Sequence, residues 1–242
     1  MQKFNLEEKK KQLYEVELQL DKINPNYYLL DGVINFEAYF NSQFKVLICN
    51  MENYGYDGSK YYLKNVYESW LKDSYVNGKN KRVYPKTFRN SMRFIYVLLE
   101  KISKNKDVGF KLERNTDSLN LLKNVVNQIA YINIRKTSNK TGSTKADVNA
   151  IKENALKNDE LIKKQIEILE PDILIIGGEL TRNILNDFYD NKMPKFKKIE
   201  IVKDGFSKPT IVCSLRHFSR CNYAKWKADL NAIVDNVTSI TN

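Results

Sequence analysis

The sequence predicts an α/β protein with a three-layer α/β/α arrangement around a central, mostly parallel sheet of four strands. Four short apolar runs are typical of buried strands. Helical patterns long enough to form crossover connections lie between them, and strands that alternate with helices in this way imply a parallel sheet covered on both faces. With 242 residues, of which 42% are hydrophobic, the chain can bury the core of one such domain. The four predicted strands are residues 46–49, 129–134, 172–176 and 210–214.

Helical patterns fill most of the intervening chain. Apolar side chains recur at helical spacing between charged ones in residues 5–22, which predicts an amphipathic helix there. We therefore expect residues 1–40 to form a helical N-terminal extension of a single domain that spans residues 1–242. Residues 198–202 precede an Asp-Gly turn and predict either a fifth strand or an edge ribbon. Further helices are expected at residues 59–75, 87–104, 118–128 and 147–169, and from about residue 223 onward.

The net charge of +11 favours a polyanionic partner. Nucleic acid is the first candidate, because neutralisation of phosphates by lysine and arginine supplies most of its non-specific affinity for proteins. The alternative is a lysine-rich surface without a dedicated partner. We expect a nucleic-acid partner and a monomeric protein.

Three cysteines, Cys49, Cys213 and Cys221, have no spacing typical of a disulfide framework, a zinc site or an iron–sulfur cluster. Two of them fall inside predicted strands, where cysteine acts as a small core residue. No metal or other cofactor is therefore expected. No apolar stretch approaches the roughly 20 residues that cross a bilayer, and the charged N-terminus lacks signal-peptide features, so we expect a cytoplasmic protein.

A carboxylate and the single histidine of the chain follow two of the predicted strands. In α/β sheets, ligands bind at the carboxyl ends of the strands. Glu52 follows the first run, and a carboxylate there can position a water molecule or stabilise a developing positive charge. His217 follows the last run, with Ser219 and basic residues beside it, and can face a leaving group. The alternatives are a solvated loop carboxylate and a structural histidine.

Polar residues and glycines mark the ends of the two other runs. Asn133 interrupts an apolar strand near its end, where a side-chain amide can read the edge of a nucleobase or cap a turn. The basic loop at 135–143 offers donors to phosphate oxygens, as any flexible surface turn does. Gly177 and Gly178 lack the third glycine of a dinucleotide fingerprint, so we interpret them as sites of close packing of a helix on a strand.

Taken together, these strand ends resemble the uracil-DNA glycosylase superfamily over roughly residues 40–235. Residues 50–54, Asn-Met-Glu-Asn-Tyr, occupy the place of the family's water-activating Gly-Gln-Asp-Pro-Tyr loop. Tyr-Ile-Asn at 131–133 resembles the strand that ends in the base-reading asparagine. Pro-Lys-Thr-Phe-Arg-Asn at 85–90 resembles the Pro-Ser-Leu-x-Asn helix start with one residue inserted. His-Phe-Ser at 217–219 resembles the His-Pro-Ser loop.

The resemblance implies a DNA glycosylase that cleaves the N-glycosidic bond of a pyrimidine swung out of the duplex, with Glu52 and His217 as catalytic residues. It implies that Asn133, Tyr54 and Asn50 bind the substrate base. No lysine stands at a matching nucleophile position, which implies a monofunctional enzyme that leaves an abasic site. The residues implied in DNA binding are Ser219, Arg220, Arg216, Arg135, Lys136 and Thr87, with Arg220 rather than Cys221 as the residue that wedges into the duplex.

Departures from the family's motifs bear on the substrate. Glu52 replaces the family's aspartate, and Phe218 replaces the proline of the histidine loop. A tyrosine at the position of Tyr54 commonly excludes bases substituted at C5, yet the altered loop can equally accommodate a modified pyrimidine. Uracil and modified cytosine or uracil are both candidates, in base-excision repair or in defence against phage DNA.

Two other functions fit the same sequence. A non-catalytic nucleic-acid-binding protein explains the charge and needs neither Glu52 nor His217. A small-molecule transferase or hydrolase on a flavodoxin-like fold predicts that the mouth of the sheet is not basic. Binding and cleavage of DNA distinguish the three.

Overall fold

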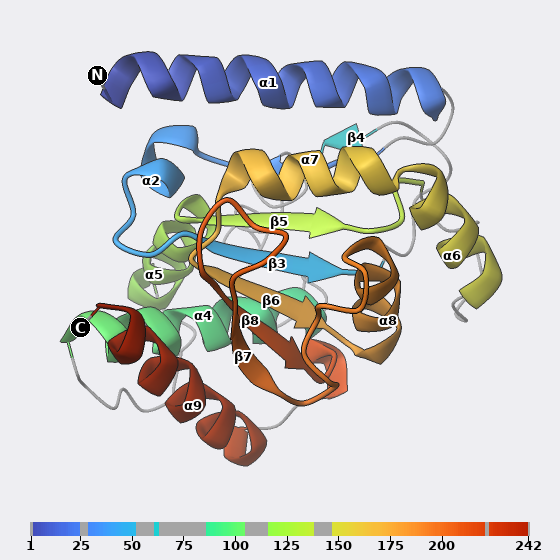
Figure 1. The fold of residues 1–242 in the computed structure, drawn as a ribbon. Coiled ribbons are helices and arrows are strands. Elements are labelled where there is room, and N and C mark those ends of the chain that lie inside the picture. The colour runs from blue at the N-terminus through green and yellow to red at the C-terminus, as the bar shows by residue number, and fades with distance from the viewer. Residues whose placement is uncertain are drawn as a thin grey trace.

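The computed structural model describes residues 2–24, 29–51, 61–62, 86–104, 116–137, 147–220 and 223–241. Within them, helices and strands follow one another along the chain as Figure 1 shows. The helices are α1 (Gln2–Ile23), α2 (Phe36–Phe40), α4 (Lys86–Lys104), α5 (Thr116–Asn127), α6 (Val148–Lys157), α7 (Asp159–Leu169), α8 (Glu179–Phe188), the short η1 (Phe218–Arg220) and α9 (Tyr223–Thr241). The strands are β1 (Leu29–Leu30), β2 (Gly32–Val33), β3 (Val46–Asn50), β4 (Tyr61–Tyr62), β5 (Ile129–Asn133), β6 (Ile173–Gly177), β7 (Ile199–Val202) and β8 (Thr210–Leu215).

A six-stranded sheet in the order β2-β5-β3-β6-β8-β7 lies at the centre of the fold. Its four inner strands are parallel, and the two outer strands pair antiparallel with their neighbours. The α/β class and the mostly parallel sheet are therefore confirmed, and the four predicted runs are its parallel strands. The predicted total of four strands was wrong, because short edge strands carry little sequence signal: β2 has two residues, and β7 is only partly buried. The open choice at residues 198–202 is resolved in favour of an antiparallel edge strand.

The parallel strands are buried on both faces, which explains why they appear in the sequence as continuous apolar runs. Successive side chains point to opposite faces, so β3 places Val46 and Ile48 on one face and Leu47 and Cys49 on the other. The first face packs against α4, α5 and α9, and the second against α1, α7 and α8. Each face of the sheet therefore has a hydrophobic core of its own.

The predicted helices differ from the observed ones mainly at one break. The helical pattern at 147–169 forms two helices, because Asn158 ends α6 and precedes α7. The buried Asn158 side chain donates to the carbonyl of Asn154 at 2.6 Å and so stabilises the break. The helix expected at 59–75 lies outside the described residues, except for Tyr61–Tyr62, which form β4. The helices expected at 5–22, 87–104 and 118–128 and from about residue 223 correspond to α1, α4, α5 and α9.

The described residues of the N-terminal segment 1–40 contribute side chains to the hydrophobic core. Helix α1 lies along α7 (Figure 1) and buries Leu13, Val16 and Leu20 in the second core. Between α1 and α2 the chain forms β1 and β2, which the sequence did not predict, and β2 adds an edge strand to the sheet. The segment therefore contributes directly to the sheet and to its cover.

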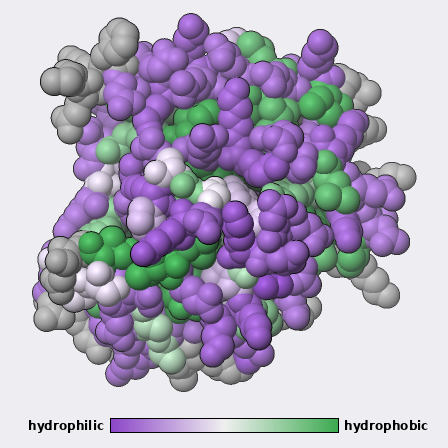
Figure 2. Space-filling view, viewed as in Figure 1, coloured by the Kyte–Doolittle hydropathy of each residue, from purple (hydrophilic) through white to green (hydrophobic). Residues whose placement is uncertain are grey.

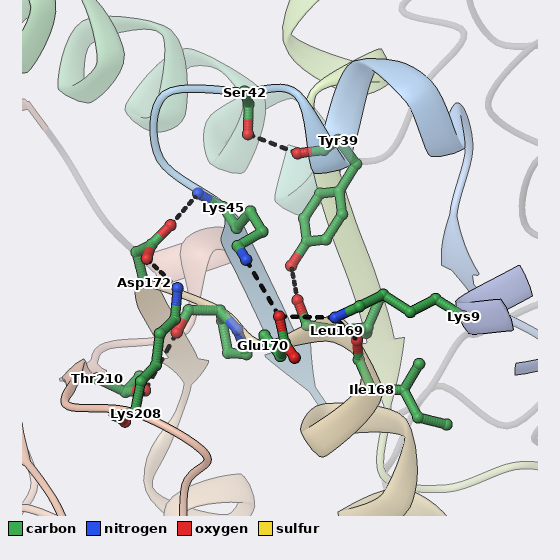
Figure 3. Close-up of polar contacts among 11 residues, drawn as sticks. Lys9, Tyr39, Ser42, Lys45, Ile168, Leu169, Glu170, Asp172, Lys208 and Thr210 are labelled. Carbon is green, nitrogen blue, oxygen red and sulfur yellow. Dashed lines mark hydrogen bonds and ion pairs between the residues drawn. The ribbon is translucent and has the colours of Figure 1, made fainter. Parts of the chain in front are cut away.

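A polar cluster links the N-terminal helices to the amino ends of the parallel strands (Figure 3). The carboxylate of Asp172 accepts hydrogen bonds from the backbone N–H of Lys45, at 2.7 Å, and from Nζ of Lys208. Glu170, directly after α7, pairs with Lys9 of α1 at 2.6 Å. Paired charges thus lie at the amino ends of the strands, whereas ligands of α/β sheets bind at the carboxyl ends.

The surface drawn in Figure 2 is covered mainly by hydrophilic side chains, with smaller hydrophobic areas between them. No helix within the described ranges is long and apolar enough to span a membrane. Among the same residues, no group of three or more histidine, cysteine, aspartate or glutamate side chains is arranged to hold a metal ion.

Candidate functional site

The carboxyl ends of the parallel strands bring several predicted site residues to one edge of the sheet. Asn50, at the end of β3, and Asn133, at the end of β5, are direct partners in the strand register. Each lies two residues beyond a side chain of the first core, Ile48 and Tyr131 respectively. Both amides therefore lie on the face that α4, α5 and α9 cover.

The Asn50 amide is held between neighbouring strands. Its Nδ2 donates to the hydroxyl of Tyr131, whereas its buried Oδ1 has no hydrogen-bond partner in the described part of the chain. At the end of β6, a Cβ on Gly177 would overlap this oxygen. Position 177 must therefore be glycine to leave room for the Asn50 side chain. This corrects the interpretation of Gly177 as a position where a helix packs on a strand.

The Asn133 amide is fully buried, and neither its Nδ2 nor its Oδ1 has a hydrogen-bond partner among the described residues. Burying such a group without partners costs roughly 1–3 kcal/mol. Its backbone is firmly held, because the Asn133 N–H donates to Asp31 Oδ2 at 2.6 Å. An unpartnered buried amide needs an explanation, and a water molecule or a bound ligand can supply the missing hydrogen bonds.

His217 lies at the same edge, two residues beyond the end of β8. Its side chain faces Gly178, where a Cβ would lie 3.5 Å from the Cβ of His217. Gly178 has a φ of 105°, a conformation that glycine adopts readily and other residues rarely do. Its N–H donates to the carbonyl of Leu215 at 2.9 Å, which joins the ends of β6 and β8 beneath the imidazole.

Ser219 makes two contacts with Nδ1 of the His217 ring. The backbone N–H of Ser219 points to Nδ1 at 3.4 Å, and the Ser219 hydroxyl lies 2.7 Å from the same nitrogen. Because a backbone N–H can only donate, this contact favours Nδ1 as the acceptor and the tautomer of the neutral ring that carries its proton on Nε2. A neutral imidazole of this form can donate a hydrogen bond from Nε2.

Phe218 anchors the loop that carries His217. Phe218 is fully buried, and its ring lies 5.6 Å from that of Phe94 and 6.1 Å from that of Trp226. Its carbonyl accepts a hydrogen bond at 2.8 Å from Nδ2 of Asn90, near the start of α4. The sequence motif at 85–90 contains Asn90 but does not predict this contact, because only the fold brings α4 beside the loop.

The structure describes only some of the other predicted site residues. Glu52, Tyr54 and the side chain of Arg220 lie outside the described residues. Thr87, in the first turn of α4, is half-buried, as are Ser219 and Arg216. Arg135 is only 9% exposed, and its Nε donates to Thr137 Oγ1 at 3.0 Å.

Lys136 was predicted to bind DNA, and the structure corrects this prediction. The side chain is fully buried, and its Nζ pairs with both carboxylate oxygens of Asp31, at 2.9 and 3.0 Å. Gln165 of α7 accepts a third hydrogen bond from the same nitrogen at 2.7 Å. A lysine held in this way cannot reach a phosphate at the surface. Instead, Lys136 and Asp31 together fix the end of β5, which carries Asn133.

Glu17 of α1 lies near this buried ion pair. Burial, and to a smaller extent the negative charge of Asp31, raise the pKa of Glu17 to about 7, although the positive charge of Lys136 opposes the shift. The folded protein therefore keeps this proton to a higher pH than the unfolded chain does. The contribution of Glu17 to stability is greatest below its ordinary pKa of 4.5 and falls as the pH rises through about 7.

Glu17→Gln is therefore expected to remove part of the loss of stability between pH 5 and pH 8. Relative to the wild type, the variant should gain about 1–2 kcal/mol over this interval, a value that allows for solvent screening at a half-buried position. Urea unfolding across this pH range measures the difference. Glu15→Gln, on the exposed side of the same helix, is the matched control. Parallel pH profiles for wild type and Glu17→Gln would contradict the expected effect.

No model of a known protein family matches this sequence, and no curated protein matches it significantly. Function is therefore inferred from the arrangement of Asn50, Asn133, Gly178 and His217 at the carboxyl edge of the sheet.

Proposed function

We propose that the protein is a monofunctional DNA glycosylase that hydrolyses the N-glycosidic bond of a flipped-out pyrimidine. The observation that carries the proposal is the fully buried, unpartnered amide of Asn133 at the same sheet edge as His217. An asparagine side chain presents a donor and an acceptor next to each other, as the edge of a pyrimidine does. The mostly parallel six-stranded sheet supports the proposal, because its parallel strands end together and so bring these residues to one side of the fold.

In the proposed reaction, the target nucleotide first leaves the base stack, at a cost of a few kcal/mol. Glu52 takes a proton from a water molecule, whose oxygen forms a bond to the sugar C1′. The bond from C1′ to the base breaks, and its electron pair leaves with the base. Nε2–H of His217 donates a hydrogen bond to an oxygen of the departing base and so stabilises its negative charge, an effect worth roughly 3–4 kcal/mol.

The remaining predicted residues take supporting roles. Asn133 reads the base, and Asn50 and Tyr54 contact it from the adjoining strand end and loop. Ser219, Arg216, Thr87 and Arg135 lie on elements around this edge and are proposed to contact the DNA, with Arg220 as the wedge. The reaction requires no metal and leaves an abasic site.

The proposal is tested with DNA duplexes that contain uracil or a modified cytosine, followed by alkali, which breaks the strand at abasic sites. We expect alkali-dependent breaks at one class of modified pyrimidine. His217→Ala and Glu52→Gln should each reduce the cleavage rate by about 10²-fold or more. Ser239→Ala, an exposed position on α9, is the control and should cleave at the wild-type rate. Wild-type rates for both site variants would show that the assigned roles are wrong.

A non-catalytic nucleic-acid-binding protein is the second candidate, and the net charge of +11 favours it equally. It predicts salt-sensitive DNA binding that His217→Ala and Glu52→Gln leave unchanged, without abasic sites in any substrate. Genomic DNA from phages with modified and with unmodified bases extends the assay. Cleavage of only the modified genomes would favour a role in defence over one in repair.

A further inference from the structure

A loop between α8 and β7 carries a dense group of exposed cations. Residues 192–198, here called the lysine loop, contain four lysines in seven positions, and all four are exposed. None of them forms an ion pair with a described carboxylate, and the ring of Phe196 lies 5.2 Å below Nζ of Lys197. The four lysines are Lys192, Lys195, Lys197 and Lys198.

The backbone of the lysine loop is held by side chains of α8. Arg182 donates from Nε to the carbonyl of Pro194 at 2.8 Å and from Nη2 to that of Met193 at 3.2 Å. The Asn186 amide accepts from the Met193 N–H at 3.2 Å and donates to Asn191 Oδ1 at 2.5 Å. Met193 and Pro194 are buried. The loop therefore presents its lysines from a fixed backbone, which lowers the entropic cost of binding a partner.

The lysine loop lies at the same edge of the sheet as the candidate site. Strand β7 runs antiparallel to β8, so it begins beside the carboxyl end of β8, as Figure 1 shows. The carbonyl of Lys198 accepts a hydrogen bond from the Ser214 N–H at 2.9 Å. Ser214 precedes His217 by three residues, a span of at most about 10 Å of extended chain. A DNA strand bound at the histidine loop could therefore contact the lysine loop within a few nucleotides.

We infer that the lysine loop binds the phosphate backbone of duplex DNA next to the base that enters the site. Lysines at these positions neutralise phosphates and release counterions, and they need no base contacts to do so. The flanking carboxylates, Asp190 and Glu200, are themselves exposed to solvent. DNA as the partner rests on the proposed glycosylase function, but phosphate binding itself needs no catalysis.

An anionic membrane surface fits the loop less well. Stable attachment to a membrane interface combines basic residues with apolar side chains that enter the lipid. The exposed large hydrophobic residues of the described chain lie on α1, α5, α6 and α9. None lies in the lysine loop, where Phe196 is half-buried.

The test measures binding of a fluorescent DNA duplex without modified bases, over a series of salt concentrations, to the variant K192Q/K195Q/K197Q/K198Q. We expect an affinity loss of at least about 10-fold near 0.1 M salt, and a log–log salt slope that is smaller by about 2–4. The matched control, K11Q/K22Q/K123Q/K164Q, removes the same charge from exposed lysines of α1, α5 and α7 and should lose much less affinity. Unchanged thermal unfolding verifies that both variants fold.

Equal losses in the two variants would show that only net charge matters and would overturn the inference. Wild-type affinity in the lysine-loop variant, or binding to phosphatidylserine vesicles instead of DNA, would overturn it as well. A selective loss of DNA affinity supports the inference even where no substrate base is cleaved. In that case the catalytic proposal fails and the phosphate-binding surface is retained.

Discussion

Replacing Asp31 with alanine is expected to lower the free energy of unfolding by about 3–5 kcal/mol, because the charge of Lys136 then remains buried without its counter-ion. The two side chains are 1% and 0% exposed, so water cannot replace the lost carboxylate. The variant also deprives the Asn133 N–H of its acceptor. Chemical denaturation with circular dichroism measures the loss.

Two further variants separate the buried charge from other effects. Glu160→Gln removes a carboxylate that is 79% exposed and pairs with Lys163, and its effect should stay below about 1 kcal/mol. Asp31→Asn with Lys136→Met keeps an acceptor for the Asn133 N–H while it removes both charges. This double variant should be more stable than Asp31→Asn alone. A loss below about 1 kcal/mol for Asp31→Ala would mean that Lys136 finds another partner or solvent.

Asn133→Ala is expected to reduce kcat/KM for the cleaved base by about 10²–10³-fold and to leave stability unchanged or higher. The activity falls because the base loses its hydrogen-bonding partner. Stability does not fall, since the amide forms no hydrogen bond with the described residues and its removal ends an unfavourable burial. A binding residue of this kind lowers activity when changed, whereas a structural residue lowers stability.

Single-turnover cleavage and thermal unfolding of the same Asn133→Ala preparation therefore form one experiment. Asn124→Ala, an exposed asparagine on α5, is the matched control and should change neither quantity. A large drop in thermal stability with unchanged cleavage would assign Asn133 to the core and remove it from the site.

The candidate site could be predicted in part from the sequence, for a simple reason. Parallel strands all end at one edge of their sheet, so polar residues that follow apolar runs are expected to gather there. Asn50 and Asn133 do so as register partners, and His217 follows the end of β8, which β6 separates from β3. The contacts of Gly177 with Asn50 and of Asn90 with the histidine loop could not be predicted, because they join segments distant in sequence.

Lys136 also shows that contacts between distant segments cannot be predicted from the sequence. In sequence it follows Arg135 in a basic loop, where lysine is normally exposed. Its burial depends on Asp31, more than a hundred positions away, and on Gln165 of α7. The pairing of charges across a fold leaves no local pattern in the chain.

The sequence by itself determined the α/β class, the four parallel strands and the strongly basic character of this protein, because burial and charge act on each segment locally. Only the tertiary structure decided the order of the strands, the short edge strands and the choice between a buried lysine and a surface one. Those features depend on contacts between segments that are distant in sequence. The free energy of such a contact depends on both segments, so neither segment alone predicts it.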